Sequence, residues 1–209
     1  MNQNNQAILY YVHDPMCSWC WAFVPSWSKI QSELAGHLEI HYLLGGLAAD
    51  SAQVMPLAMQ QTISGYWKTI QQRVPGTQFN FDFWSQCQPR RATYPACRAV
   101  IAARAQHLAS EKPMIRAIQE AYYLQAKNPS DDEVLADLAA QLDLDRERFL
   151  QDLNHPQTQH TLEIEMQQGQ ALGAQGFPSL ILQQANTARY IPLDYNHPDV
   201  VLKQLATFL

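Results

Sequence analysis

The chain has 209 residues, of which 47% are hydrophobic and 16% charged, with a formal net charge of −5 at pH 7; this length suits one compact domain or one domain that carries an insertion. The acidic balance provides no basic face to neutralise phosphates, which argues against a nucleic-acid partner. No apolar run reaches the length of a membrane span, and the N-terminal segment lacks the basic and apolar parts of a secretory signal, so we expect a cytoplasmic protein with no membrane partner.

The first part of the chain predicts the βαβ unit of a parallel sheet. Residues 7–12 are apolar and β-prone, as in a short buried strand. After a loop, apolar residues recur at helical spacing over 19–36, and Pro25 inside this pattern predicts a kink. Residues 38–44 alternate and then become continuously apolar, as a second buried strand would.

The middle of the chain is helical, and strands return near its end. Helices are predicted at 53–73, 94–109, 113–126, 131–141 and 145–153. They are followed by a helix at 157–172, strands at 179–183 and 188–192, and a closing helix at 197–208. We therefore expect a helical domain over 51–155, inserted into an α/β domain formed by 1–50 and 156–209.

Two cysteines, Cys17 and Cys20, lie where the first helix is expected to begin. They can close a small disulfide ring, and the unpaired N–H groups and dipole of the helix N-terminus favour the thiolate of Cys17. Cys17 can then attack a disulfide, and Cys20, one turn further on, can resolve the mixed disulfide. The alternatives for a C-x-x-C motif are half of a zinc site and two buried structural thiols. No second such motif supplies the other two ligands, so we expect no metal.

A Gly-Phe-Pro-Ser segment, residues 176–179, precedes the third predicted strand. A proline at this place does not belong to a central strand ladder. A cis bond between Phe177 and Pro178 would make a tight turn that exposes the Phe177 backbone to an extended substrate chain. The residues alone leave the commoner trans turn as the alternative.

The order of strand, DPMCSWCW, helix, strand, helical insertion, helix, GFPS and strand resembles the DsbA family of oxidoreductases, especially its FrnE-like branch. The resemblance covers essentially the whole chain. It implies an α/β, thioredoxin-like fold with a large all-helical domain inserted after the second strand. It also implies that Cys17 is the nucleophile, that Cys20 is the resolving thiol, and that Pro178 is cis and packs against the pair. We expect the substrate to contact Ser18, Trp19, Phe177 and Pro178.

The sequence departs from the best-known family members in three ways. Ser18 and Trp19 stand between the cysteines in place of Pro and His, so a strongly oxidising potential is not implied. Phe177 precedes the proline where Val or Thr is more usual, which alters the shape of the docking surface. No signal peptide is evident, and in a reducing cytosol we expect a reductase or isomerase of protein or small-molecule disulfides. A thiol-based redox partner would reset it, with no cofactor unless glutathione serves as co-substrate.

Several polar residues near the motif have two interpretations each. Asp14 and His13 could relay the proton of the reacting thiol. Alternatively, they only begin a loop, since Asp before Pro is an ordinary turn residue. Arg90 and Arg91 could attract an anionic substrate such as glutathione, or form a solvated charge cluster.

The two remaining cysteines, Cys87 and Cys97, also leave two interpretations. Nine residues separate them, which permits a second disulfide that could relay electrons to the first pair. Alternatively, Cys97 is a buried structural thiol, a common fate of free cysteine.

Two other functions remain open at this point. One is a glutathione-binding isomerase or transferase of the kappa and 2-hydroxychromene-2-carboxylate isomerase type, which resembles this fold but carries Ser in place of the first cysteine. The other is a non-enzymatic, thioredoxin-like module that binds extended peptides or acts as a chaperone. Retention of both Cys17 and Cys20 argues against the first alternative, and a reversible disulfide between them would argue against the second.

Overall fold

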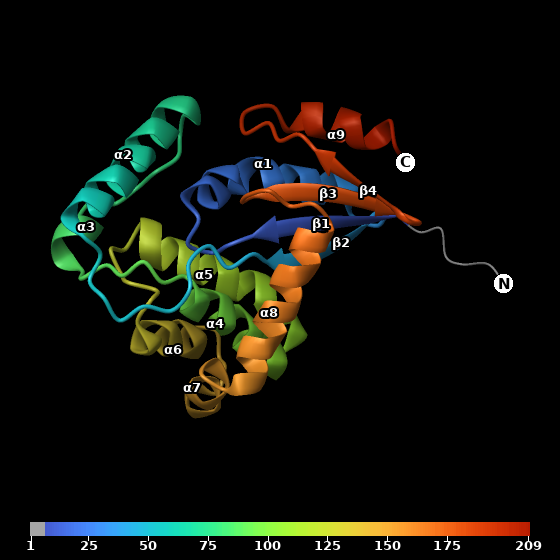
Figure 1. The fold of residues 1–209 in the computed structure, drawn as a ribbon. Helices are drawn as coiled ribbons and strands as arrows, with labels where there is room; N and C mark the ends of the chain where they lie inside the picture. The colour runs from blue at the N-terminus through green and yellow to red at the C-terminus, as the bar shows by residue number, and fades with distance from the viewer. Residues whose placement is uncertain (1–6) are drawn as a thin grey trace.

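The computed structural model describes residues 7–209, and its centre is a four-stranded mixed sheet (Figure 1). The strands are β1 (Ile8–His13), β2 (Glu39–Leu44), β3 (Ser179–Gln184) and β4 (Thr187–Ile191), in the order β2-β1-β3-β4. β1 and β2 are parallel, which confirms the predicted βαβ unit, whereas β3 is antiparallel to both β1 and β4.

The pairing of β1 with β3 brings together two segments that are far apart in the sequence. Val12 near the end of β1 lies opposite Ser179 at the start of β3. Because the two strands run in opposite directions, the loop that leaves β1 and the loop that enters β3 lie next to each other, at the same end of the strands. The first of these loops ends at Cys17, where the CSWC motif begins, and the second contains the Phe177–Pro178 bond.

Alternating side chains of β1 bury both faces of the sheet. On one face Leu9 and Tyr11 pack with residues of α1 (Ser18–Leu34) and α9 (Pro198–Ala206). On the other face Tyr10 and Val12 join a smaller core near α8 (Pro156–Ala171), where the absence of a side chain at Gly169 lets the helix approach Val12. The strand is therefore covered by helices on both sides.

The helical insertion follows β2, as predicted. Its helices are α2 (Leu57–Arg73), α3 (Phe83–Gln86), α4 (Tyr94–Gln106), α5 (Glu111–Tyr123), α6 (Asp132–Gln141) and α7 (Arg146–Leu153), with a 3₁₀ turn at Leu108–Ser110. The sequence missed the four-residue α3. It also placed the start of α2 four residues too early, because Pro56 is the residue that precedes the helix.

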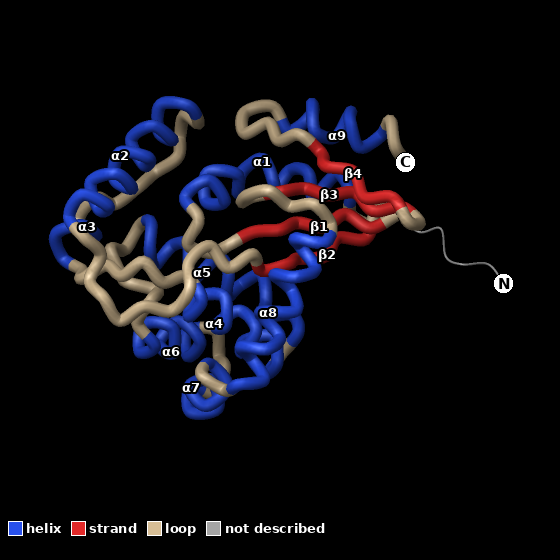
Figure 2. The backbone as a smooth tube through the Cα atoms, viewed as in Figure 1, coloured by secondary structure: helices blue, strands red, loops and turns tan. Residues whose placement is uncertain are grey.

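The largest hydrophobic core lies in the insertion and extends into α1. Trp21 of α1 is buried, stacks on Tyr123 of α5 and donates to the carbonyl of Gln78 at 2.9 Å. The division of the chain at residues 50 and 155 stays a prediction, because this core is shared across the first of these boundaries. Figure 2 shows the strands among helices, with α1 and α9 on one side of the sheet and α8 on the other.

None of the helices within residues 7–209 combines the length and the apolar character that a membrane crossing requires.

Candidate active site

Cys17 and Cys20 occupy the first turn of α1. Cys17 is the N-cap residue with an extended backbone, and its N–H donates to the carbonyl of Asp14 at 3.0 Å. Cys17 is 7% exposed and lines a cavity, whereas Cys20 is 0% exposed. Burial raises the pKa of the Cys20 thiol well above its usual value, and the neighbouring Cys17 raises this pKa further. Cys17 therefore borders the cavity whereas Cys20 is enclosed, and their roles as attacking and resolving groups stay predictions.

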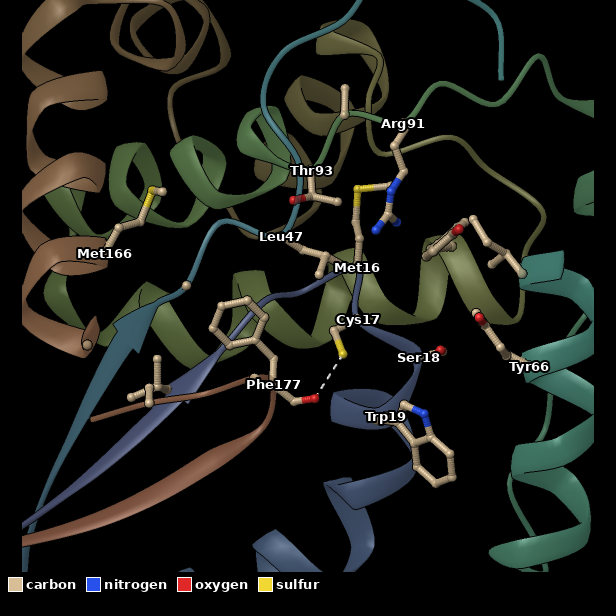
Figure 3. Close-up of a pocket in the computed structure, with 18 of the residues that line it drawn as sticks. Met16, Cys17, Ser18, Trp19, Leu47, Tyr66, Arg91, Thr93, Met166 and Phe177 are labelled. Carbon is tan, nitrogen blue, oxygen red and sulfur yellow. Dashed lines mark hydrogen bonds between the residues drawn. The ribbon is translucent and has the colours of Figure 1, made fainter. Parts of the chain in front are cut away.

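The segment before β3 lies directly against Cys17. The Phe177–Pro178 bond is cis, as the family resemblance implies. The Cys17 thiol donates to the Phe177 carbonyl oxygen, with 3.4 Å between sulfur and oxygen (Figure 3). The backbone of residue 177 is thus placed where a substrate bound at Cys17 would pass.

A cavity of about 590 Å³ opens beside Cys17. Ser18, Trp19 and Phe177 line it, as predicted for substrate contacts, whereas Pro178 lines a separate hollow on the other side of Phe177. The far wall comes from α2, which contributes Tyr66. This volume lies in the range of pockets that hold small organic ligands.

The two arginines at the cavity differ in how they are held. Arg90 pairs with Asp131 at 2.5 Å and donates to the carbonyl of Ser130, so its charge is already compensated. For Arg91, no carboxylate within residues 7–209 lies at ion-pair distance. Figure 3 shows the Arg91 side chain beside Met16, directed toward the Cys17 side of the cavity. No Asp or Glu lines this cavity, so its mouth is positive in a chain that is negative overall.

The Asp14 carboxylate is fully buried behind the cysteine motif and accepts four hydrogen bonds. One oxygen accepts from the Met16 N–H at 2.8 Å. The other accepts from the Leu47 N–H at 2.7 Å, the Thr93 hydroxyl at 2.6 Å and the Cys97 thiol at 3.5 Å. Burial raises the pKa of Asp14, and these donors oppose that rise. The predicted proton relay stays a prediction, and the geometry shows a hub that joins three segments.

His13 is fully buried at the end of β1. Its ring stacks on Tyr11, with 5.0 Å between the ring centroids, and neither ring nitrogen has a hydrogen-bond partner among the described residues. Burial lowers the pKa of His13 from 6.5 to about 3. The side chain is therefore neutral near pH 7, and its surroundings favour packing over proton relay.

Cys87 and Cys97 bind different partners. The Cys97 thiol donates to Asp14, whereas the Cys87 thiol donates to the carbonyl of Ala126 at 3.0 Å. Burial raises the pKa of both thiols, most strongly for the fully buried Cys97. The burial of Cys97 fits the structural interpretation, and the second redox pair stays a prediction.

Sequence reasoning missed Thr93, Gly45 and Tyr66 at this site. Thr93 and Gly45 carry no local signal, because each is brought to the site by a contact with a remote residue. Tyr66 had one signal: Ile63, Tyr66 and Trp67 are spaced three and four residues apart, so they share the face of α2 that lines the cavity.

A family model described as Thioredoxin matches residues 10–191, a span that contains both the cysteine pair and the cis bond. The chain belongs to the thioredoxin family. In this chain, the site described above lies where the end of β1 meets the start of β3.

Solved structures with a similar fold include disulfide oxidoreductases. A candidate protein disulfide isomerase from Nitrosomonas europaea matches this chain with a TM-score of 0.84 at 25% identity, covering 97% of each chain. The cytosolic disulfide reductase DsbM from Pseudomonas aeruginosa matches with a TM-score of 0.77 at 24% identity, covering 96% of this chain and 98% of DsbM. The expected DsbA-like fold with a helical insertion is confirmed, and membership of the FrnE-like branch stays a prediction.

Relatives found by sequence are described as adapter proteins. The ClpXP adapter protein SpxH of Halalkalibacterium halodurans is 24% identical over 177 residues, which are 83% of this chain and 57% of SpxH. SpxH of Bacillus subtilis is 25% identical over 159 residues, which are 76% of this chain and 52% of that protein. The chain thus spans little more than half the length of these relatives.

Replacing Asp14 by Asn should destabilise the fold. An amide has only one acceptor oxygen. In either orientation its NH₂ group therefore faces at least one buried donor that now bonds to the carboxylate. The loss should lower the free energy of unfolding by about 1–3 kcal/mol. Urea denaturation at pH 7 measures this cost. Thr93→Ser, which keeps the hydroxyl donor, is the matched control and should lose less stability. An Asp14→Asn variant as stable as the wild type would contradict the role of this carboxylate as a hub.

Replacing His13 by Phe should make the free energy of unfolding fall less steeply as the pH is lowered from 6.5. In the wild type the unfolded chain binds a proton at His13 below pH 6.5, whereas the folded chain does so only near pH 3. The contribution of His13 is therefore fully present above pH 6.5 and is lost as pH falls, by about 4 kcal/mol at pH 3. Urea midpoints from pH 7 to pH 3.5 should fall less for His13→Phe than for the wild type. The exposed His160, replaced by Gln, should leave the profile unchanged.

Proposed function

We propose that the protein is a thiol-disulfide oxidoreductase whose redox centre is the pair Cys17 and Cys20. The observation that carries this proposal is the different surroundings of the two thiols. Cys17 lines the cavity and contacts the Phe177 backbone, whereas Cys20 is enclosed one turn further along α1. An accessible thiol beside a substrate-sized cavity, followed by an enclosed partner, suits attack and resolution in turn.

The reaction proceeds in two exchanges. The Cys17 thiolate attacks one sulfur of the substrate disulfide, the substrate S–S bond breaks, and the departing thiolate takes up a proton. Cys20 then loses its proton and attacks the Cys17 sulfur of the mixed disulfide, which releases the second substrate thiol. The substrate gains two electrons and two protons, and the protein is left with a Cys17–Cys20 disulfide. We propose Asp14 as the acceptor of the Cys20 proton, because its backbone and its carboxylate both act on the Cys20 thiol and burial raises the pKa of the carboxylate.

The direction of exchange that we propose is reduction or isomerisation in the cytoplasm. The cytosolic reductase DsbM shares the fold over almost the whole chain. An external thiol must then return the Cys17–Cys20 disulfide to the dithiol form. Glutathione is the thiol that we propose, since a structure of DsbM with GSH has the same fold, with a TM-score of 0.76.

The cavity supports a substrate that carries carboxylates. Arg91 has no carboxylate partner among the described residues, and the cavity wall contains no acidic side chain. A guanidinium at the mouth of a cavity attracts and orients a carboxylate. Glutathione disulfide carries several carboxylates around a central S–S bond, so its disulfide can reach Cys17 while one carboxylate contacts Arg91.

Serine variants of the two cysteines test the reaction directly. Cys17→Ser should abolish reduction of glutathione disulfide and of insulin, because it removes the attacking sulfur. Cys20→Ser should accumulate a mixed disulfide at Cys17, because it removes the resolving sulfur. Coupled reductase assays and intact-protein mass spectrometry measure the two effects, with Cys87→Ser as the control that should keep activity.

Three outcomes would contradict the redox assignment. Unchanged turnover in Cys17→Ser would remove Cys17 from the reaction. Glutathione bound by the wild type without redox cycling would indicate the isomerase or transferase alternative. Peptide or partner binding that needs neither thiol, in a protein that does not turn over, would indicate the binding module that the adapter name of the SpxH relatives suggests.

Arg91→Ala should weaken the use of anionic disulfides selectively. Loss of one partly solvated carboxylate contact should raise the KM for glutathione disulfide about tenfold. The KM for the uncharged 2-hydroxyethyl disulfide should stay unchanged. For glutathione disulfide, the KM of Arg91→Lys should lie between those of the wild type and Arg91→Ala, because lysine keeps the charge but lacks the paired N–H donors of the guanidinium. Steady-state kinetics at low and high salt measure these effects. An equal rise for both substrates would show that Arg91 shapes the cavity and does not recognise charge.

A further inference from the structure

The Phe177 side chain lies on a glycine. Gly45 directly follows β2, and a Cβ atom built on it would lie 1.9, 2.2 and 2.6 Å from the Cε1, Cζ and Cδ1 atoms of the Phe177 ring. Real Cβ atoms do not approach other heavy atoms this closely. The ring therefore occupies the space that any other residue at position 45 would fill with its side chain.

Backbone conformation does not explain the glycine at position 45. The next residue, Gly46, has a φ of 62° and needs the freedom of glycine, whereas Gly45 is not among the residues with positive φ. The Gly45 N–H donates to the carbonyl of His13 at 2.7 Å, as in a continued strand ladder. The backbone at position 45 would accept an ordinary L-residue, so the ring of Phe177 is what requires glycine here.

Phe177 packs in part against the small core that contains Val12 and Ile181, and it also borders open space. Phe177 lines the cavity of about 590 Å³ that contains Cys17, and also two further hollows of about 540 and 700 Å³. Figure 3 shows the ring between Cys17 and Met166, close to the reactive sulfur. A ring displaced from Gly45 has these hollows to enter, and each of them adjoins the residue whose carbonyl contacts Cys17.

We propose that Gly45 is a positioning residue that fixes substrate access to Cys17 by holding the Phe177 ring out of the approach to its sulfur. The inference rests on the proposed exchange at Cys17 and adds a determinant of substrate size. With the ring on Gly45, a bulky disulfide reaches the Cys17 sulfur past the Phe177 backbone. With a side chain at position 45, the ring turns into the neighbouring hollows and narrows that approach. Small reagents are affected less than large ones.

The test compares Gly45→Ala with the double variant Gly45→Ala/Phe177→Val. Cys17 is alkylated with iodoacetamide, a small reagent, and with fluorescein-5-maleimide, a large one, and its modification is followed by peptide mass spectrometry. Gly45→Ala should slow the large reagent about ten- to a hundredfold and the small reagent much less. The double variant should recover most of the lost rate, because Val leaves room for the new methyl group.

A matched control is available on α2. A Cβ added at Gly65 meets nothing within 4 Å, so Gly65→Ala should leave both alkylation rates unchanged. Circular dichroism and thermal melts identify loss of fold, which would slow or accelerate both reagents together in Gly45→Ala. Wild-type rates with the large reagent in a folded Gly45→Ala variant, or no recovery in the double variant, would overturn the proposal.

The same variants separate this proposal from the proposed function. Alkylation needs only access to the Cys17 sulfur, so its size dependence is measured even if the wild type fails to reduce any disulfide. If the wild type does turn over glutathione disulfide, Gly45→Ala should lower kcat/KM for it more than for 2-hydroxyethyl disulfide, and the double variant should restore the ratio.

Discussion

The buried carboxylate of Asp14 is the contact on which the arrangement of the site depends. It lies between the turn before Cys17, the loop after β2 and the residue before α4, and it accepts from Met16, Leu47 and Thr93, one donor in each. A carboxylate out of contact with water is tolerated only when its oxygens are fully hydrogen-bonded. This requirement makes the three segments interdependent, because displacement of any one of them leaves buried charge uncompensated.

The sheet supplies the second half of the arrangement. Antiparallel pairing of β1 with β3 places Phe177 next to the turn that Asp14 holds, and parallel pairing of β1 with β2 places Gly45 under the Phe177 ring. The reactive sulfur thus lies at the meeting point of three chain segments that strand register fixes. The helical insertion then adds Arg91 and the α2 wall of the cavity, the parts that we propose contact the substrate away from its sulfur.

The sequence predicted what depends on local pattern. The strands, most helices and the cysteine motif follow from apolar periodicity and spacing, and the cis bond before Pro178 followed only from the family resemblance. The sequence could not show that Arg90 and Arg91 differ in their availability to a substrate, because only the fold shows that Asp131 neutralises Arg90. Gly45 was equally hidden, since its role arises from a ring 132 positions further along the chain. Local chemistry was therefore predictable, whereas selectivity, which depends on tertiary contacts, was not.

In the thiol-disulfide exchange that we propose, burial gives the two thiols an order of action. Cys20 has a raised pKa and no exposure, so it holds its proton and does not meet a disulfide from solution. It reacts only when Cys17, its neighbour one turn away, carries the substrate and becomes an electrophile at short range. A mixed disulfide at Cys17 also replaces the thiol that now donates to the Phe177 carbonyl, which frees that oxygen for the N–H of a bound chain. The attack that makes Cys17 an electrophile therefore also exposes the acceptor that can hold the substrate while Cys20 reacts.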